Sequence, residues 1–337
     1  MNRHSLRVLE FEKIRSRVRD RCLTAEGARS VSRERLETDE AELARLLDHV
    51  GVVKTALGTG VDAPALSFPP VATTLDRAEK EGSVLEPIDL AEIAAFARST
   101  LLLHRYLMTA AGEAGTTAAM ESVLGDAPDV SHVPARLLRY VDPDGTVRER
   151  EIPELRAIRS QILRCQQDLQ STANGLTSRD DVRRFLSATV PTQRDGRTVI
   201  ALKADHRGKL PGIVHEVSGS GATVFIEPQE LVARNNAVVE AENRYRNELL
   251  KILRDLTSFC RTALPELRAG LAWTVGIDRI YCRARFSYDF ACERAGVAEG
   301  RLTLRGARHP LLGETAVPIN VEIPPGKRVL IVTGPNT

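Results

Sequence analysis

Through residues 1–135, apolar side chains recur every three or four positions, which is the spacing of amphipathic helices. One such run extends over 6–18, a second begins at Asp39, and a third spans 88–107. Thr24 stands where a helix needs an N-cap. We therefore predict that this part is a helical core, a scaffold in which no catalytic constellation is visible.

Two stretches of this part have a different pattern. Residues 58–70 are polar and proline-rich, and we expect them to form a loop between two helices. Residues 110–130 are rich in Ala, Gly and Thr, which predicts a mobile connection after the third helix.

Two longer amphipathic runs follow, each covering about 30 residues, or roughly 45 Å of helix. The first places Leu155, Ile158, Ile162, Cys165, Leu169, Thr172 and Leu176 on a heptad seam. The second places Val238, Ala241, Tyr245, Leu249, Ile252, Leu256, Phe259 and Ala263 on one face. They predict an antiparallel coiled-coil arm, with 136–182 as its outgoing helix and 233–300 as its returning helix and more core. Two ordinary core helices are the alternative.

Between these runs, residues 183–232 change to the period of two that is typical of strands. The predicted strands are 198–204, 213–217 and 222–226, separated by the turns 207–212 and 218–221. Asp195-Gly196 is the turn that leads into the first strand. We expect a small antiparallel sheet at the end of the arm.

The same insert carries a modest excess of positive charge, with eight Lys or Arg against five acids between Arg183 and Arg234. Five of the basic residues lie close to the turns: Arg194, Arg197, Lys203, Arg207 and Lys209. There they could contact a phosphate backbone without reading bases. A merely solvated loop is equally consistent with the charge, and the turn Ser218–Gly221 is more simply a hairpin than a binding loop.

Composition narrows the class of protein. Of 337 residues, 27% are charged and 4% aromatic, and the net charge of +2 gives no whole-chain field that favours nucleic acid. The five cysteines are odd in number and form no C-x-x-C pair, which favours reduced thiols over disulfides or a metal site. No apolar stretch approaches the length of a membrane span. We expect a cytoplasmic protein.

Near residue 300 the period changes again, from helix to strand. The apolar run 329–332 predicts a buried strand, and Gly334-Pro335-Asn336-Thr337 after it matches the opening of a phosphate-binding P-loop. The second Gly and the Lys of that motif do not appear, so we expect 301–337 to be the start of a truncated ATPase domain. On this interpretation the chain is the front part of a larger nucleotide-dependent protein and does not hydrolyse ATP by itself. A strand that ends in an ordinary turn is the simpler alternative.

Several stretches, in this order, resemble the MutS family of ATPases, and above all its bacterial second branch, MutS-two. They are Leu9–Ile14, His215–Pro228, Asn235-Asn236, and Arg308-His309-Pro310 ahead of Gly334. The resemblance covers essentially the whole chain. It implies a mainly α fold with a small antiparallel β insert: a helical core, a lever arm with a β clamp at its tip (183–232), and the first strands of the ATPase.

The resemblance also implies a function. In this branch an ATP-driven homodimer suppresses homologous recombination by acting on branched DNA, and a C-terminal Smr domain supplies endonuclease activity in full-length members. ATP and Mg²⁺ would serve the full-length protein, and none is expected on this chain. The domains that read mismatches would precede the core, and this chain starts at the core, which points away from mismatch repair. Some members instead bind collided ribosomes and split them. A coiled-coil structural NTPase is a further alternative, although it would predict a longer heptad run and no basic tip.

Candidate site residues follow from the matched motifs. The resemblance assigns phosphate binding to Gly334–Thr337, a possible adenine wall to Val317 and Pro318, and an ordering role ahead of the ATPase to Arg308, His309 and Pro310. The clamp residues that we expect to contact a nucleic-acid backbone are Arg194, Arg197, Lys203, Arg207 and Lys209. No catalytic residue and no metal ligand is expected in this chain.

Overall fold

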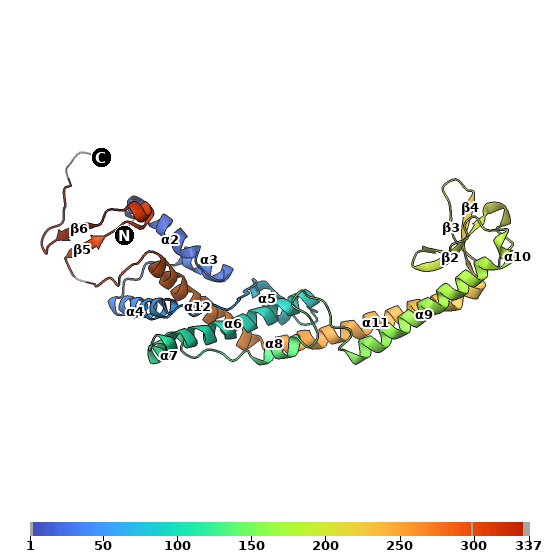
Figure 1. Ribbon diagram of the computed structural model, residues 1–337, viewed down its shortest axis with the longest axis horizontal. Helices are drawn as coiled ribbons and strands as arrows, with labels where there is room; N and C mark the ends of the chain where they lie inside the picture. The colour runs from blue at the N-terminus through green and yellow to red at the C-terminus, as the bar shows by residue number, and fades with distance from the viewer. Residues whose placement is uncertain (1–2, 298, 333–337) are drawn as a thin grey trace.

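A computed structural model describes residues 3–297 and 299–332 of the chain. The molecule is elongated: a helical core continues into a two-helix arm, and a small sheet sits at the far end of the arm (Figure 1). The mainly α fold with a β insert is therefore confirmed. The elements are α1 (Arg3–Val8), α2 (Phe11–Arg19), α3 (Ala25–Arg33), α4 (Glu40–Leu57), α5 (Ala72–Glu79), α6 (Pro87–Glu113), α7 (Thr117–Leu124), α8 (His132–Leu137), α9 (Pro153–Ser178), α10 (Asp180–Arg183), β1 (Thr192–Arg194), β2 (Arg197–Lys203), η1 (Ala204–His206), β3 (Gly212–Val217), β4 (Thr223–Pro228), α11 (Gln229–Thr262), α12 (Leu264–Asp289), β5 (Leu302–Ala307), η2 (Pro310–Thr315) and β6 (Ile319–Ile323).

Helix α6 organises the core because it contributes to both apolar clusters. Its N-terminal half supplies Ile93 and Phe96 to a cluster with α5, α8 and the adjoining ends of α11 and α12. Its C-terminal half supplies Leu103 and Leu107 to a second cluster with α4, α7 and α12. The helix begins where a capping box and a proline at its first position favour a start. The helix predicted over 88–107 is confirmed.

One buried carboxylate fastens the start of α3 to α12. Asp278 accepts hydrogen bonds from the backbone N–H groups of Leu23, at 2.8 Å, and Thr24, at 2.9 Å, and from the Thr24 hydroxyl, at 2.8 Å. That hydroxyl in turn accepts from the N–H of Gly27, which confirms the predicted N-cap. Burial raises the pKa of Asp278, and these three hydrogen bonds oppose the rise. The site leaves no space around Gly27, where a Cβ would lie 2.1 Å from Asp278 Oδ2.

The arm is formed by α9 and α11 running side by side in opposite directions, as predicted (Figure 1). The heptad seam of α9 is confirmed, since Leu155, Ile162, Leu169 and Leu176 are buried and belong to that seam. At 1.5 Å per residue, the 26 residues of α9 span about 39 Å and the 34 of α11 about 51 Å.

The arm joins the core through a turn that precedes α9. Within the predicted outgoing segment the helix itself begins at Pro153, a residue suited to the first helical position. Ahead of it the chain doubles back through a Val141–Val147 bridge, and Val141 is buried against the core. The hydroxyl of Tyr245 on α11 donates to Glu149 of this turn at 2.6 Å. Burial and this carboxylate raise the pKa of Tyr245 to about 12.

The tip sheet, β1 to β4, has the strand order β1-β2-β4-β3 with antiparallel pairing throughout. All three predicted strands are present, and β1 is an additional short strand. Asp195 and Gly196 both have positive φ, which suits the tight turn between β1 and β2. The inner face packs Ile200, Leu202 and Ile226 against the ends of α9 and α11. The sheet is therefore continuous with the hydrophobic seam of the arm.

Two expectations from the sequence are wrong, and the first concerns the segment 110–130. It is not a mobile connection, because it contains the end of α6 and the whole of α7. Met120 of α7 is completely buried, and Val123 and Leu124 join it in the second core cluster. Ala110 and Ala111 are buried at the end of α6, whereas the glycines of the segment have open space around them, so the composition alone misrepresents packed helix as flexibility.

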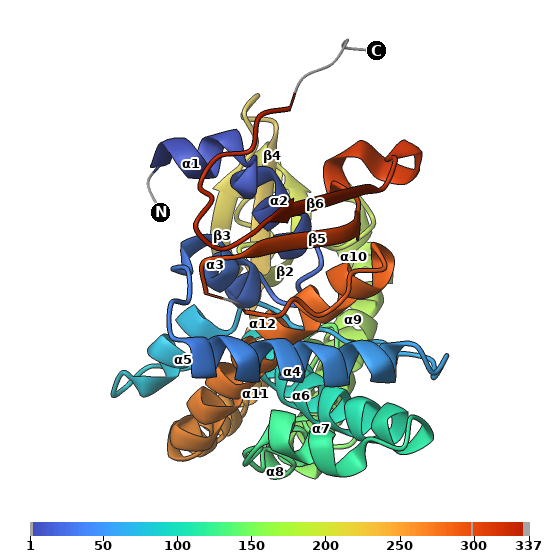
Figure 2. The same ribbon diagram turned by 90° about the vertical axis from the view of Figure 1, so that its left-hand side faces the viewer.

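The apolar run 329–332 is the second exception, since it forms no strand and its four side chains are 50–86% exposed. Strand pairing needs a neighbouring backbone, and among the described residues β5 and β6 pair only with each other. These two strands lie at the end of the molecule opposite the tip sheet (Figure 1) and face the viewer in Figure 2, and η2 between them contacts α2. Their presence confirms the change from helix to strand near residue 300.

We predict that Gly27→Ala destabilises the core by about 2 kcal/mol, because the added methyl group overlaps a carboxylate held by three hydrogen bonds. Gly51→Ala is the matched control, since Gly51 lies inside α4 with open space around it and alanine favours helix by up to about 1 kcal/mol. Urea unfolding followed by circular dichroism measures both. Equal stability of the two variants would contradict the prediction.

Candidate nucleic-acid interface

The tip sheet presents exposed positive side chains beside the short helix η1. Lys203, Arg207 and Lys209 are all exposed, and in the described part of the chain none of their side chains forms a hydrogen bond or an ion pair. Their backbone is nevertheless held by turn hydrogen bonds, such as the one from Lys209 N to His206 O at 2.9 Å. These three predicted residues therefore extend flexible charges from a fixed turn.

An adjacent basic residue, which sequence reasoning did not single out, joins them. Phe185, just after α10, accepts a hydrogen bond at its carbonyl from Lys203 N at 3.0 Å. Its ring lies 4.9 Å from that of His206, and the Arg184 guanidinium lies 4.8 Å from the centre of the same ring. We call Arg184, Lys203, Arg207 and Lys209 the basic cluster. The signal that could have revealed Arg184 is its place in Arg183-Arg184-Phe185, a basic pair next to an aromatic residue.

Arg194, another of the predicted contacts, is partly exposed and is paired with an acidic residue. It forms an ion pair with Glu216 on β3 at 2.6 Å, and its guanidinium lies 4.2 Å from the centre of the Phe225 ring. Its side chain is still 39% exposed. The structure therefore places Arg194 on the outer face of the sheet with its charge partly balanced.

Arg197 is directed inward, where it belongs to a group that we call the carboxylate network: Arg197, His215, Glu227, Asn235 and Asn236. The acceptor at its centre is Glu227, whose side chain is only 1% exposed. Arg197 donates to Glu227 Oε1 at 2.7 Å and to Asn236 Oδ1 at 2.8 Å. His215 lies 2.7 Å from the other carboxylate oxygen.

Asn235 connects this network to the backbone of the sheet. Its side-chain amide donates to Glu227 Oε1 at 2.9 Å and to Thr198 O at 3.1 Å, and its Oδ1 accepts from Thr198 N at 2.9 Å. Burial would raise the pKa of Glu227, but hydrogen bonds from His215, Asn235 and Arg197 outweigh it and hold that pKa below its ordinary value. The network joins β2, β3 and β4 to α11.

The residues expected near an ATPase site, as far as they are described, lie around η2 and the end of the β5–β6 ladder where Ala307 pairs with Ile319. His309 caps η2, its Nδ1 accepting from Leu311 N at 3.3 Å, and Pro310 O accepts from Arg17 of α2 at 3.0 Å. Val317 and Pro318 are exposed ahead of β6, and Arg308 lies between β5 and η2. The predicted phosphate-binding residues Gly334–Thr337 lie outside the described residues.

Three further properties of residues 3–297 and 299–332 concern metal sites, membrane-spanning helices and cysteines. No group of three or more His, Cys, Asp or Glu is arranged there to hold a metal ion. None of the helices in these ranges combines the length and the apolar character that crossing a membrane requires. All five cysteines lie in these ranges, and each is free.

No family model matches the chain. Its sequence is nevertheless similar to curated proteins named Endonuclease MutS2. The protein of Thermomicrobium roseum is 32% identical over 98% of this chain and 43% of its own length. That of Symbiobacterium thermophilum is 31% identical over 100% of the chain and 42% of its own length. That of Thermotoga petrophila is 33% identical over 76% of the chain and 33% of its own length. The chain belongs to the MutS2 family.

The MutS2 membership fits the architecture, since the similarity runs through core, arm and tip sheet alike. The chain spans about 43% of the length of the Thermomicrobium relative. The endonuclease activity in the name of these relatives therefore refers to those longer proteins. In this chain, the exposed basic cluster is the feature best suited to contact nucleic acid.

We predict that Glu227→Gln loosens the tip sheet by about 2 kcal/mol at pH 7, because the neutral amide loses the charge-assisted hydrogen bonds to Arg197 and His215. Hydrogen exchange of β2 and β4, corrected for the intrinsic rate at each pH, measures this loss. Glu216→Gln is the control, since its exposed ion pair with Arg194 contributes about 0.5 kcal/mol or less.

The pH dependence has a defined sign. The folded pKa of Glu227 lies below the ordinary 4.5, so its stabilisation is fully present above pH 4.5 and is lost as the pH falls through the folded pKa. The difference between the wild type and Glu227→Gln should therefore shrink below pH 4.5. A difference that stays constant down to pH 3 would contradict this origin.

Proposed function

We propose that the chain is the core, arm and clamp of an ATP-dependent, DNA-binding MutS2 protein that suppresses homologous recombination by acting on branched DNA. The observation that carries this proposal is the basic cluster, which presents positive charge without acidic partners at the end of a long arm. The name of the relatives, Endonuclease MutS2, supports a DNA-processing role for the full-length protein.

Charge and geometry both support a clamp. Lysine and arginine on flexible stems contact phosphates without regard to sequence, which suits a protein that holds DNA by its shape. The arm places these charges about 40–50 Å from the core. Two such arms in a homodimer would enclose a space between them, and a branched junction offers phosphate backbones on several sides at once.

In the full-length protein, this function would also require a nucleotide site and a nuclease. ATP and Mg²⁺ would bind where Gly334–Thr337 begin a P-loop, with Val317 and Pro318 close to the adenine and Arg308–Pro310 ordering the approach. The endonuclease step would belong to an Smr domain of the full-length protein. That protein would act as a homodimer in the cytoplasm. Mismatch repair is not part of the proposal.

The same cluster would also suit a ribosomal RNA surface, because RNA offers the same phosphates. We predict that full-length protein binds a four-way DNA junction more tightly than linear duplex of equal length, with an affinity that falls steeply with salt. Binding of the same protein to collided disomes, measured by co-sedimentation, is compared with its binding to the junction. Co-sedimentation with disomes, together with equal affinity for the junction and the linear duplex, would contradict recombination suppression and favour ribosome rescue.

The contacts themselves can be tested by neutralising Lys203, Arg207 and Lys209 to glutamine together. We predict on the order of tenfold weaker junction binding and a salt slope smaller by about one unit for each phosphate that is no longer neutralised. Arg197 is left intact, because replacing it would disturb the carboxylate network as well as the surface. The charge-matched control replaces Arg156, Arg164 and Arg254, three exposed residues on the arm. A triple tip variant that binds like this control would place the contacts elsewhere.

A further inference from the structure

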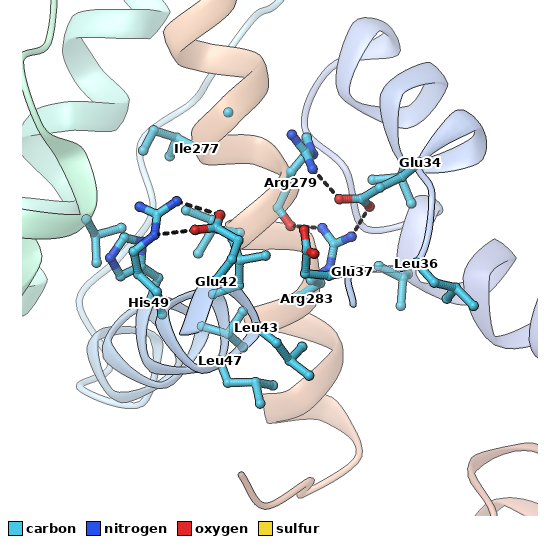
Figure 3. Close-up of a pocket in the computed structure, with 18 of the residues that line it drawn as sticks. Glu34, Leu36, Glu37, Glu42, Leu43, Leu47, His49, Ile277, Arg279 and Arg283 are labelled. Atoms are coloured by element: carbon cyan, nitrogen blue, oxygen red, sulfur yellow. Dashed lines mark hydrogen bonds and ion pairs between the residues drawn. The ribbon is translucent and has the colours of Figure 1, made fainter. Parts of the chain in front are cut away.

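A cavity of about 750 Å³ lies in the core, far from the tip sheet. It is bounded by α2, by residues 34–37 after α3, by α4, by the end of α7 and by α12 (Figure 3). Small-molecule sites in proteins fall in the range of about 300–1,000 Å³. The cavity therefore has the size of a ligand site.

Its interior is apolar on two opposite sides. Helix α2 is amphipathic, yet none of its residues is buried, and Phe11, Ile14 and Val18 line the cavity instead of a packed core. Across the space, Leu43 and Leu47 of α4 are likewise only half-buried. Protein interiors are normally close-packed, so these facing apolar side chains leave space for an apolar body.

The rim of the cavity is positively charged. Five arginines and three glutamates line it, so positive side chains outnumber negative ones. Two of the arginines, Arg279 and Arg283 on successive turns of α12, both hold the carboxylate of Glu34, one at each oxygen (Figure 3). A pair of guanidinium groups is well suited to bind a carboxylate.

Glu34 is a replaceable occupant of this pair. It lies in residues 34–39, which form neither helix nor strand. Arg279 Nε is buried and has no hydrogen-bond partner in the described structure, so the pair retains donor capacity that Glu34 does not satisfy. Desolvation raises the pKa of Glu34, and the two arginines more than offset this, so Glu34 is an ionised competitor at neutral pH.

We propose that this cavity binds an amphipathic carboxylate, a small molecule with an apolar body and one carboxylate group. The carboxylate displaces Glu34 from Arg279 and Arg283, and the apolar body fills the space between α2 and α4. An anion fits better than a neutral or cationic ligand because arginine exceeds glutamate around the opening. The site is independent of the tip sheet and of any nucleotide.

The test uses the fluorescent probe dansylaminoundecanoate with the full chain. We expect saturable binding at one site with a micromolar Kd, and at least tenfold weaker binding of the methyl ester, which keeps the body and removes the charge. Glu34→Gln should bind the probe at least fivefold more tightly, because the internal competitor is neutral. A Glu34 that only holds the fold would predict equal or weaker binding.

Three variants separate an effect on binding from an effect on folding. Adding Arg283→Gln to Glu34→Gln should reduce probe binding to the level of the ester, whereas Arg268→Gln, an exposed arginine elsewhere on α12, should leave it unchanged. Leu47→Trp fills the space without altering charge and should abolish binding, with thermal unfolding confirming that it folds. Equal binding of acid and ester, or undiminished binding by Leu47→Trp, would overturn the proposal.

Discussion

The connection between the tip sheet and the arm depends on one buried carboxylate. Glu227 is the penultimate residue of β4, two positions before α11 begins, and its two oxygens accept from three side chains on β2, β3 and α11. Burying a charge is costly unless hydrogen-bond donors satisfy it. Here the donors come from β2, β3 and α11, so the same hydrogen bonds that satisfy the carboxylate also join these elements. The backbone is correspondingly tight, since a Cβ at Gly212 would lie 2.2 Å from Glu227 O. The orientation of the sheet on the arm follows from this group.

This arrangement also divides the basic residues of the tip into two kinds. Arg197 uses its donors inside the protein, and Arg194 is partly balanced by Glu216, whereas the basic cluster has no acidic partner among the described residues. Positive charge without an internal partner is more readily available to phosphate, because no existing ion pair has to be broken first. Part of the motif His215–Pro228 with Asn235-Asn236 therefore has a structural explanation: His215 and Asn235 contact the Glu227 carboxylate, and Asn236 contacts the arginine paired with it.

The sequence predicted the elements well wherever their pattern is local. The seam of α9 follows from seven residues at heptad spacing, and the strands of the tip follow from alternation between turns. It could not separate Arg197 from Lys203, because the difference depends on Asn236, which lies 39 positions away from Arg197. The prediction for 329–332 failed for a related reason, since a strand exists only with a neighbour. For 110–130 a local signal was available: Met120, Val123 and Leu124 have helical spacing.

Helices α11 and α12 are separated by a single residue, Ala263, so the chain runs almost without interruption from the tip sheet to the wall of the cavity. With α11 about 51 Å long, a tilt of roughly 10° at its core end would displace the tip by about 9 Å. That distance is comparable to the width of a DNA groove. Small changes of angle at the junction around Ala263 would therefore be magnified into a movement of the tip large enough to admit or release a strand.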